Sequence, residues 1–256
     1  MGPSLGRRVL AEFLGTGLLV AAVIGSGIMA TRLSPNDVGL ELFENAAATA
    51  AALVALILCL GPVSGAHFNP VVTLADAAFG GVTPTDATGY IAAQVTGAIA
   101  GAWVANGMFG LATFEWAAKT RSSGPLWGSE VVATFGLLLV IFGVVRSGRA
   151  SAAPFAVGAY IGGAYFFTAS TSFANPAVTV GRMFSNSFAG IKPSSAPAFI
   201  CFQVVGGALA VGVVRILYPR IADSAADVIV PHPEPVLAAK SGNGQAASAT
   251  PAKEPA

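Results

Sequence analysis

The hydrophobic pattern of the chain consists of long apolar runs separated by short polar connections. Six runs approach the length of about 20 residues that a helix needs to cross a bilayer. They predict spans over 9–29, 45–60 (beginning as early as Glu41), 87–108, 130–145, 155–171 and 196–217. Long apolar runs of this kind indicate helices, so the pattern predicts an all-α membrane protein with six transmembrane helices.

Two shorter apolar stretches fall between these spans, and both begin with the same kind of motif. Asn is a strong N-cap, and Pro suits the first helical position, so each motif predicts a helix start. The first stretch ends at Gly80-Gly81 and the second at Asn186, and a ten-residue helix rises ~15 Å, about half of the hydrocarbon core. We therefore expect two half-helices, beginning at Asn69-Pro70-Val71 and at Asn175-Pro176-Ala177.

The chain contains an internal repeat. Three motif pairs occur in the same order in both halves: Glu12 with Glu130, Asn69 with Asn175, and Gln94 with Gln203. They divide the chain into repeats over about 7–108 and 128–218. Each repeat holds three spans, an odd number, so the second enters the membrane from the opposite side. Inverted repeats with interrupted apolar segments in corresponding positions indicate a permeation path, rather than two ordinary surface loops.

Composition agrees with a membrane protein. Of the 256 residues, 54% are hydrophobic and 10% are charged, whereas soluble domains carry about 25% charged residues. The net charge of +1 gives no basic field for nucleic acid. The two cysteines, Cys59 and Cys201, lie inside apolar runs, where we expect buried small side chains and no disulfide framework.

The charges at the ends of the spans give the orientation. With both termini cytoplasmic, the inner side holds more basic residues than the outer side, which the positive-inside rule favours. The inner set is Arg7, Arg8, Arg146, Arg149, Arg215 and Arg220, and the outer set is Arg32, Lys119, Arg121 and Lys192. We assign 1–221 to one channel domain and 222–256, which lacks periodicity, to a disordered cytoplasmic tail.

Glu12 and Glu130 are ionisable groups near the starts of two spans. Because a carboxylate in a membrane must be compensated, we expect each to accept hydrogen bonds from half-helix or loop backbone. This favours a structural brace over a proton relay. The pairs Gly97/Gly101 and Gly158/Gly162 each place small residues on one helix face, which allows close packing of backbones.

With these motifs in place, the sequence resembles the aquaporin and glycerol-facilitator channels, the major intrinsic proteins. The resemblance is carried by 11–16, by 64–70 and by Asn175-Pro176-Ala177, and it extends over about 7–218. It implies a homotetramer in which each subunit has its own pore, with two half-helices meeting at the membrane centre. The Asn69 and Asn175 amides would face the pore and donate to a passing oxygen, while the helix N-termini oppose cations and protons.

The sequence departs from the family pattern at two places. Val71 stands where the family commonly has Ala, and Val178 stands where it usually has Arg. The resemblance implies a constriction of four residues, and carrying the family's positions over by spacing from the motifs gives Thr49, Gly163, Ser172 and Val178. The resemblance implies an aromatic and a His there in water-selective members, and two aromatics with the Arg in glycerol facilitators. All four residues here are small and uncharged, so we expect a wide aperture.

Arg182 lies one helical turn beyond Val178 and on the same face. It can line a basic vestibule that attracts polar or anionic solutes. It can equally pair with Glu41 or Glu44, or complement the C-terminus of the half-helix. Asp76 is its counterpart in the first repeat.

The resulting prediction is a passive channel for small neutral solutes in a cell membrane. The wide filter favours glycerol-like polyols or metalloid hydroxides such as arsenite, together with water. The alternatives are a water-selective aquaporin and, from other classes, a junctional structural protein or an anion or ion-coupled transporter. No cofactor, metal cluster or nucleophile–base pair is visible, which argues against an enzyme, and His67 is interpreted as a loop-positioning residue.

Overall fold

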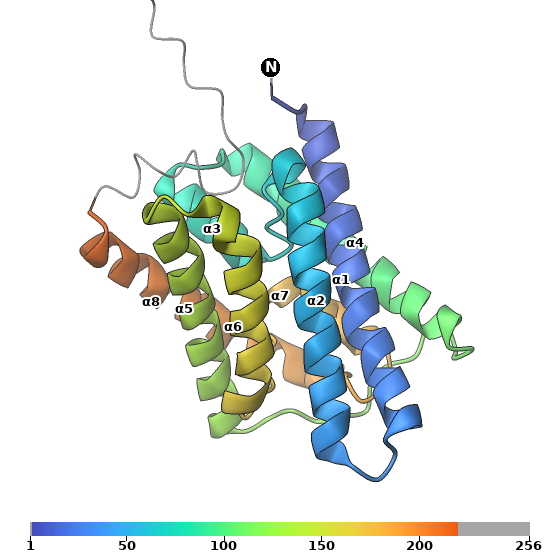
Figure 1. Cartoon of the computed structure of the whole chain (residues 1–256). Helices are drawn as coiled ribbons and strands as arrows, with labels where there is room; N and C mark the ends of the chain where they lie inside the picture. Colours follow the sequence, from blue (N-terminus) through green and yellow to red (C-terminus); the bar gives the residue numbers. More distant parts are fainter. Residues whose placement is uncertain (1, 220–256) are drawn as a thin grey trace, which may run out of the picture.

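The computed structural model describes residues 2–219, and over this range the regular elements are eight α-helices and three short 3-10 turns. Figure 1 shows α1, α2, α5 and α6 as long upright helices, with the short α3 near one end of the bundle. The helices are α1 Leu5–Leu33, α2 Val38–Ser64, α3 Pro70–Phe79, α4 Pro84–Met108, α5 Gly124–Arg146, α6 Ala153–Phe167, α7 Pro176–Gly181 and α8 Ala196–Leu217.

Each predicted span corresponds to one long helix. Five of the helices are long and apolar enough to cross a membrane. α4 is not one of those five, although its 25 residues rise ~37 Å, which is enough to span. Its hydropathy is reduced by polar side chains such as Gln94 and Asn106, and both of these are buried inside the protein.

The two half-helices begin where the motifs predict. α3 ends at Phe79 with Gly80 as its C-cap, as expected. α7 is shorter than expected, because its α-helical part ends at Gly181 and continues as a 3-10 turn over Arg182–Phe184. The predicted tail over 222–256, and Arg220, lie outside the described residues.

The helices pack as two equivalent sets, α1–α4 and α5–α8, with α1 against α4 and α5 against α8. Glycine permits both crossings. A Cβ on Gly97 would collide with the Phe13 carbonyl of α1, and a Cβ on Gly206 would collide with the Val131 carbonyl of α5. These glycines occupy the same place in the Gln-Val-x-Gly motif of each half, so the crossings repeat as the sequence does.

Small residues also line two further contacts, as predicted. Gly101 meets the Gly17 carbonyl between α4 and α1. Gly158 and Gly162 meet Ala50 between α6 and α2, which is the main contact between the two halves. In Figure 1 α2 and α6 run beside each other.

The outer surface of the bundle is apolar. Exposed residues follow one stripe of α1 at Leu10, Leu14 and Leu18, as expected of helices that face lipid. The prediction of buried cysteines is wrong, because Cys59 and Cys201 are both exposed on this surface. Apolar runs here mark lipid-facing positions as well as core positions.

Candidate functional site

The half-helices are capped by the two motif asparagines. The Asn69 Oδ1 accepts from the Val71 amide at 3.0 Å. The Asn175 Oδ1 accepts from the Ala177 amide at 3.0 Å and the Val178 amide at 3.2 Å. Each cap satisfies backbone donors that have no partner inside the helix.

The same two side chains join the half-helices to each other. The Asn69 Nδ2 donates to the Ala174 carbonyl at 2.7 Å, and the Asn175 Nδ2 donates to the Phe68 carbonyl at 2.7 Å. A primary amide has two N–H bonds, so each asparagine keeps one N–H beyond this reciprocal pair. Asn69 and Asn175 both line the central cavity.

The loops that lead into the half-helices share an unusual backbone. Three pairs of corresponding residues have a left-handed φ: Gly65 (+92°) and Thr171 (+64°), Ala66 (+49°) and Ser172 (+50°), and Phe68 (+49°) and Ala174 (+47°). Non-glycine residues in this region cost roughly 1–3 kcal/mol each and persist only where surrounding contacts fix them. The loops therefore need an external brace.

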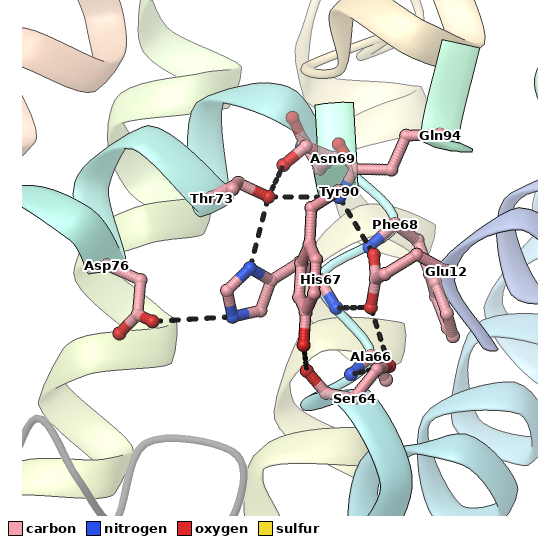
Figure 2. A network of polar contacts seen from close by, with 10 residues as sticks. All are labelled: Glu12, Ser64, Ala66, His67, Phe68, Asn69, Thr73, Asp76, Tyr90 and Gln94. Atoms are coloured by element: carbon pink, nitrogen blue, oxygen red, sulfur yellow. Dashed lines mark hydrogen bonds and ion pairs between the residues drawn. The ribbon is translucent and has the colours of Figure 1, made fainter. Parts of the chain in front are cut away.

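Glu12 supplies that brace in the first half, and Figure 2 shows its contacts. Its Oε1 accepts from Ser64 Oγ at 2.6 Å and the His67 amide at 3.0 Å. Its Oε2 accepts from the Phe68 amide at 2.7 Å and Gln94 Nε2 at 2.8 Å. Four donors thus surround a carboxylate that is fully buried, which compensates its burial.

Glu130 has the corresponding contacts in the second half. It accepts from the Phe173 amide at 3.0 Å, the Ala174 amide at 2.9 Å and Gln203 Nε2 at 2.6 Å. Both carboxylates therefore accept hydrogen bonds from loop backbone, as the sequence predicts.

The two halves differ at one pair of positions. In the first half, His67 Nε2 lies 3.6 Å from Asp76 Oδ2, and His67 Nδ1 lies 3.0 Å from Thr73 Oγ1 (Figure 2). In the second half the corresponding residues are Phe173 and Arg182, and the guanidinium carbon lies 3.4 Å from the ring centroid. The ends of the two half-helices therefore carry different charge.

A cavity of about 440 Å³ passes both motifs, and three of the four predicted filter residues line it: Thr49, Ser172 and Val178. Gly163 does not join them. It is exposed on α6, with nothing near its Cβ position. Tyr165 lines the cavity instead, and its hydroxyl lies 3.1 Å from Thr49 Oγ1.

The cavity lining therefore differs from the sequence assignment at Gly163. Counting back from Asn175 crosses a loop of irregular backbone, where sequence spacing does not determine which face of α6 points inward. The signal that identifies the face is the stripe Val157, Ile161 and Tyr165, spaced by one helical turn. All three line the cavity, so the cavity wall formed by α6 carries an aromatic side chain.

Arg182 also lines the cavity, although only 2% of its surface is exposed. Its Nε donates to the Ala189 carbonyl. Neither glutamate that the sequence offers as a partner is within ion-pair distance of it; Glu44 Oε1 instead accepts from Ser34 Oγ at 2.9 Å. Among residues 2–219 no His, Cys, Asp or Glu cluster could hold a metal ion.

Comparison with known proteins identifies the family of the chain. The chain matches the major intrinsic protein family over residues 2–172. It is 50% identical to aquaglyceroporin AqpS of Rhizobium meliloti (strain 1021) over 211 residues, covering 82% of this chain and 90% of the relative. It is 32% identical to aquaporin NIP2-3 of Zea mays over 197 residues, covering 74% and 64% of the two chains.

The fold is also that of a solved relative. The X-ray structure of the aquaglyceroporin from Plasmodium falciparum superposes with a TM-score of 0.67 at 21% identity, covering 85% of this chain and 99% of that one. Members of the matched family are membrane channels and not enzymes. The chain therefore belongs to the major intrinsic protein family and is a multi-pass membrane channel.

Proposed function

We propose that this protein is a passive channel for small neutral solutes, namely glycerol-sized polyols or metalloid hydroxides such as neutral arsenite, together with water. The observation that carries the proposal is Val178, which lines the cavity where the family usually has an arginine. Val supplies neither the five donors nor the charge of arginine at that point.

The central part of the path suits neutral hydroxylic solutes. The half-helices α3 and α7 begin at the two asparagines, so the partial positive charge of two helix N-termini opposes cations and protons there. One N–H of Asn69 and one of Asn175 remain for a solute oxygen.

We place the narrow ring of the path at Val178, together with Thr49, Tyr165 and Ser172. Its hydroxyl groups can bind a solute, and its side chains are of moderate size. Thr49 and Tyr165 share one hydrogen bond, which leaves one hydroxyl hydrogen of the pair for a solute. The Ser172 hydroxyl is buried and has no partner among the described residues, and such a hydroxyl is a place for a water or solute to bind. A 50% identical relative that is itself named an aquaglyceroporin supports the same solute class.

We further propose a homotetramer with both termini cytoplasmic, built from one channel domain over residues 1–221. The family resemblance and the apolar exposed faces support assembly in the membrane, and the excess of basic residues on the inner side supports the orientation. Native mass measurement in mild detergent should give four copies, and a conducting monomer would contradict the assembly.

Glycerol flux under imposed gradients distinguishes the proposed function from an ion-coupled transporter, a junctional protein and a water-selective pore. Glycerol efflux from proteoliposomes that hold the purified protein should follow the glycerol gradient alone. An ion-coupled transporter would change its rate when a sodium or proton gradient is added. A closed junctional protein would match empty liposomes. A water-selective pore would pass water and leave glycerol inside.

A further inference from the structure

The end of the cavity at Arg182 contains a buried cation that the neutral-solute pathway does not require. Arg182 is almost fully buried and lines the cavity, and its only side-chain hydrogen bond among the described residues runs from Nε to the Ala189 carbonyl. Its two terminal amino groups are left without protein acceptors. These groups form the planar fork that binds carboxylates and other oxyanions in two-point fashion.

A second guanidinium lies at the same aromatic ring. The Arg182 guanidinium carbon is 3.4 Å from the Phe173 ring centroid, and that of Arg121 is 5.0 Å from the same centroid. Arg121 is itself buried, and its Nε donates to the Gly190 carbonyl at 3.0 Å. Phe173 thus holds two cations together through contacts with its ring.

No carboxylate of the described residues lies within ion-pair distance of either arginine. The Glu130 carboxylate already accepts hydrogen bonds from the Phe173 and Ala174 amides and from Gln203 Nε2. Two buried positive charges therefore lie together where Arg182 lines the cavity, without a counter-ion among the described residues. Such a setting favours an anion from outside.

The neighbouring lysine reports the same positive field. Burial, followed by the charges of Arg121 and Arg182, lowers the pKa of Lys119 to about 8, with Glu41 acting in the opposite direction. Burial lowers the pKa of Arg121 to about 10. Both values leave the groups mainly protonated at pH 7, so the positive charge is present under physiological conditions.

We propose that Arg182, supported by Arg121 across Phe173, forms a binding subsite for small oxyanions with one negative charge, such as hydroxy-carboxylates of glycerol size. The subsite rests on the proposed channel function and extends its solute class. The carboxylate binds the free fork of Arg182, and the hydroxyl groups of the same solute reach the ring formed by Thr49, Tyr165 and Ser172. The absence of an arginine at position 178 leaves Arg182 as the only cation among the residues that line the described cavity.

Competition between two solutes with the same carbon skeleton tests the subsite. Glycerate is glycerol with one terminal carbon oxidised to a carboxylate, and its amide, glyceramide, is a neutral molecule of nearly the same size. In proteoliposomes of the full chain at pH 7, glycerate should slow glycerol flux at concentrations where glyceramide has little effect. The inhibition should weaken as ionic strength rises.

Variants locate the effect. Arg182→Gln should raise the glycerate concentration for half-inhibition by about tenfold or more, the size expected for a lost charged hydrogen bond. Arg182→Lys, which keeps the charge without the fork, should fall between this variant and the parent. Arg32→Gln is the matched control: it removes an arginine that is exposed and does not line the cavity, and it should leave the inhibition unchanged.

The outcomes separate this inference from the proposed function. If glycerol does not pass, the proposed solute class fails. If glycerol passes but glycerate inhibits no better than glyceramide, the subsite is wrong while the proposed solute class stands. This comparison uses the unmodified protein, so it decides the matter even if Arg182→Gln does not fold. Equal inhibition of the parent and a folded Arg182→Gln would also overturn the assignment.

Discussion

Val178 is the residue whose replacement distinguishes solute classes most sharply. Val178→Arg introduces a long cation beside Thr49 and Ser172 in a cavity of about 440 Å³. Glycerol flux should fall by about tenfold, the effect of ~1.4 kcal/mol on a barrier, while water flux falls less. Val178→Ala should leave both nearly unchanged. Stopped-flow light scattering of proteoliposomes measures both rates, and unchanged glycerol flux in Val178→Arg would place the constriction elsewhere.

Tyr165 should limit the size of solutes that pass. Its side chain lines the cavity, and its hydroxyl lies 3.1 Å from Thr49 Oγ1. Tyr165→Ala should admit polyols longer than glycerol, such as sorbitol, whereas Tyr165→Phe should keep the size limit and lose only the hydrogen bond. Size-exclusion chromatography checks that both variants fold. A folded Tyr165→Ala variant that still excludes sorbitol would show that another group sets the size limit.

These residues also show where sequence reasoning succeeds and where it stops. Thr49, Ser172 and Val178 line the cavity; the first lies on a regular helix and the other two lie within three residues of Asn175. Gly163 does not, because the residues between it and Asn175 include left-handed turns at Thr171 and Ser172. Spacing fails where the backbone leaves regular geometry.

At the scale of elements, the buried carboxylates hold the re-entrant loops in place. Glu12→Gln replaces one acceptor oxygen by an NH₂ group, which then faces donors from Ser64 and His67 or from Phe68 and Gln94. We expect a loss of roughly 1–3 kcal/mol from the buried unpaired donors. Thermal denaturation in detergent measures it. Glu115→Gln on an exposed connection is the control, and equal melting of the two variants would contradict the brace.

The crossing of α1 and α4 gives a second test at this scale. Gly97→Val places side-chain atoms against the Phe13 carbonyl, and overpacking of this kind costs typically 1–3 kcal/mol. Gly107→Ala lies on the same helix with open space at its Cβ, so it should be neutral. The melting temperature should fall only for Gly97→Val. An unchanged melting temperature in Gly97→Val would mean that α1 and α4 can move apart without loss of stability.

The elements follow from the sequence where local signals are strong. The N-caps Asn69 and Asn175 and the C-cap Gly80 mark half-helix ends, and these are found where predicted. The early end of α7 at Gly181 was not predictable. It coincides with the packing of Arg182 on Phe173 and the Ala189 carbonyl, contacts that come from tertiary structure.

At the scale of the whole molecule, the duplicated fold contains one consistent asymmetry. The pair His67 and Asp76 stands at the end of one half-helix, and Phe173 and Arg182 stand at the other. The sequence identifies Asp76 and Arg182 as counterparts. Only the fold shows that each contacts the residue two positions before the motif asparagine of its own half. The two halves are therefore alike at the asparagines and different at these pairs, and of Asp76 and Arg182 only the arginine lines the described cavity.

The central claim concerns the width of this path, and the glycerol-to-water flux ratio of the unmodified protein tests it most directly. Proteoliposomes should reswell in glycerol at a rate far above that of empty liposomes, and they should also shrink rapidly under a non-permeant osmolyte. A protein that conducts water at high rate while glycerol permeability stays at the empty-liposome level would contradict the account.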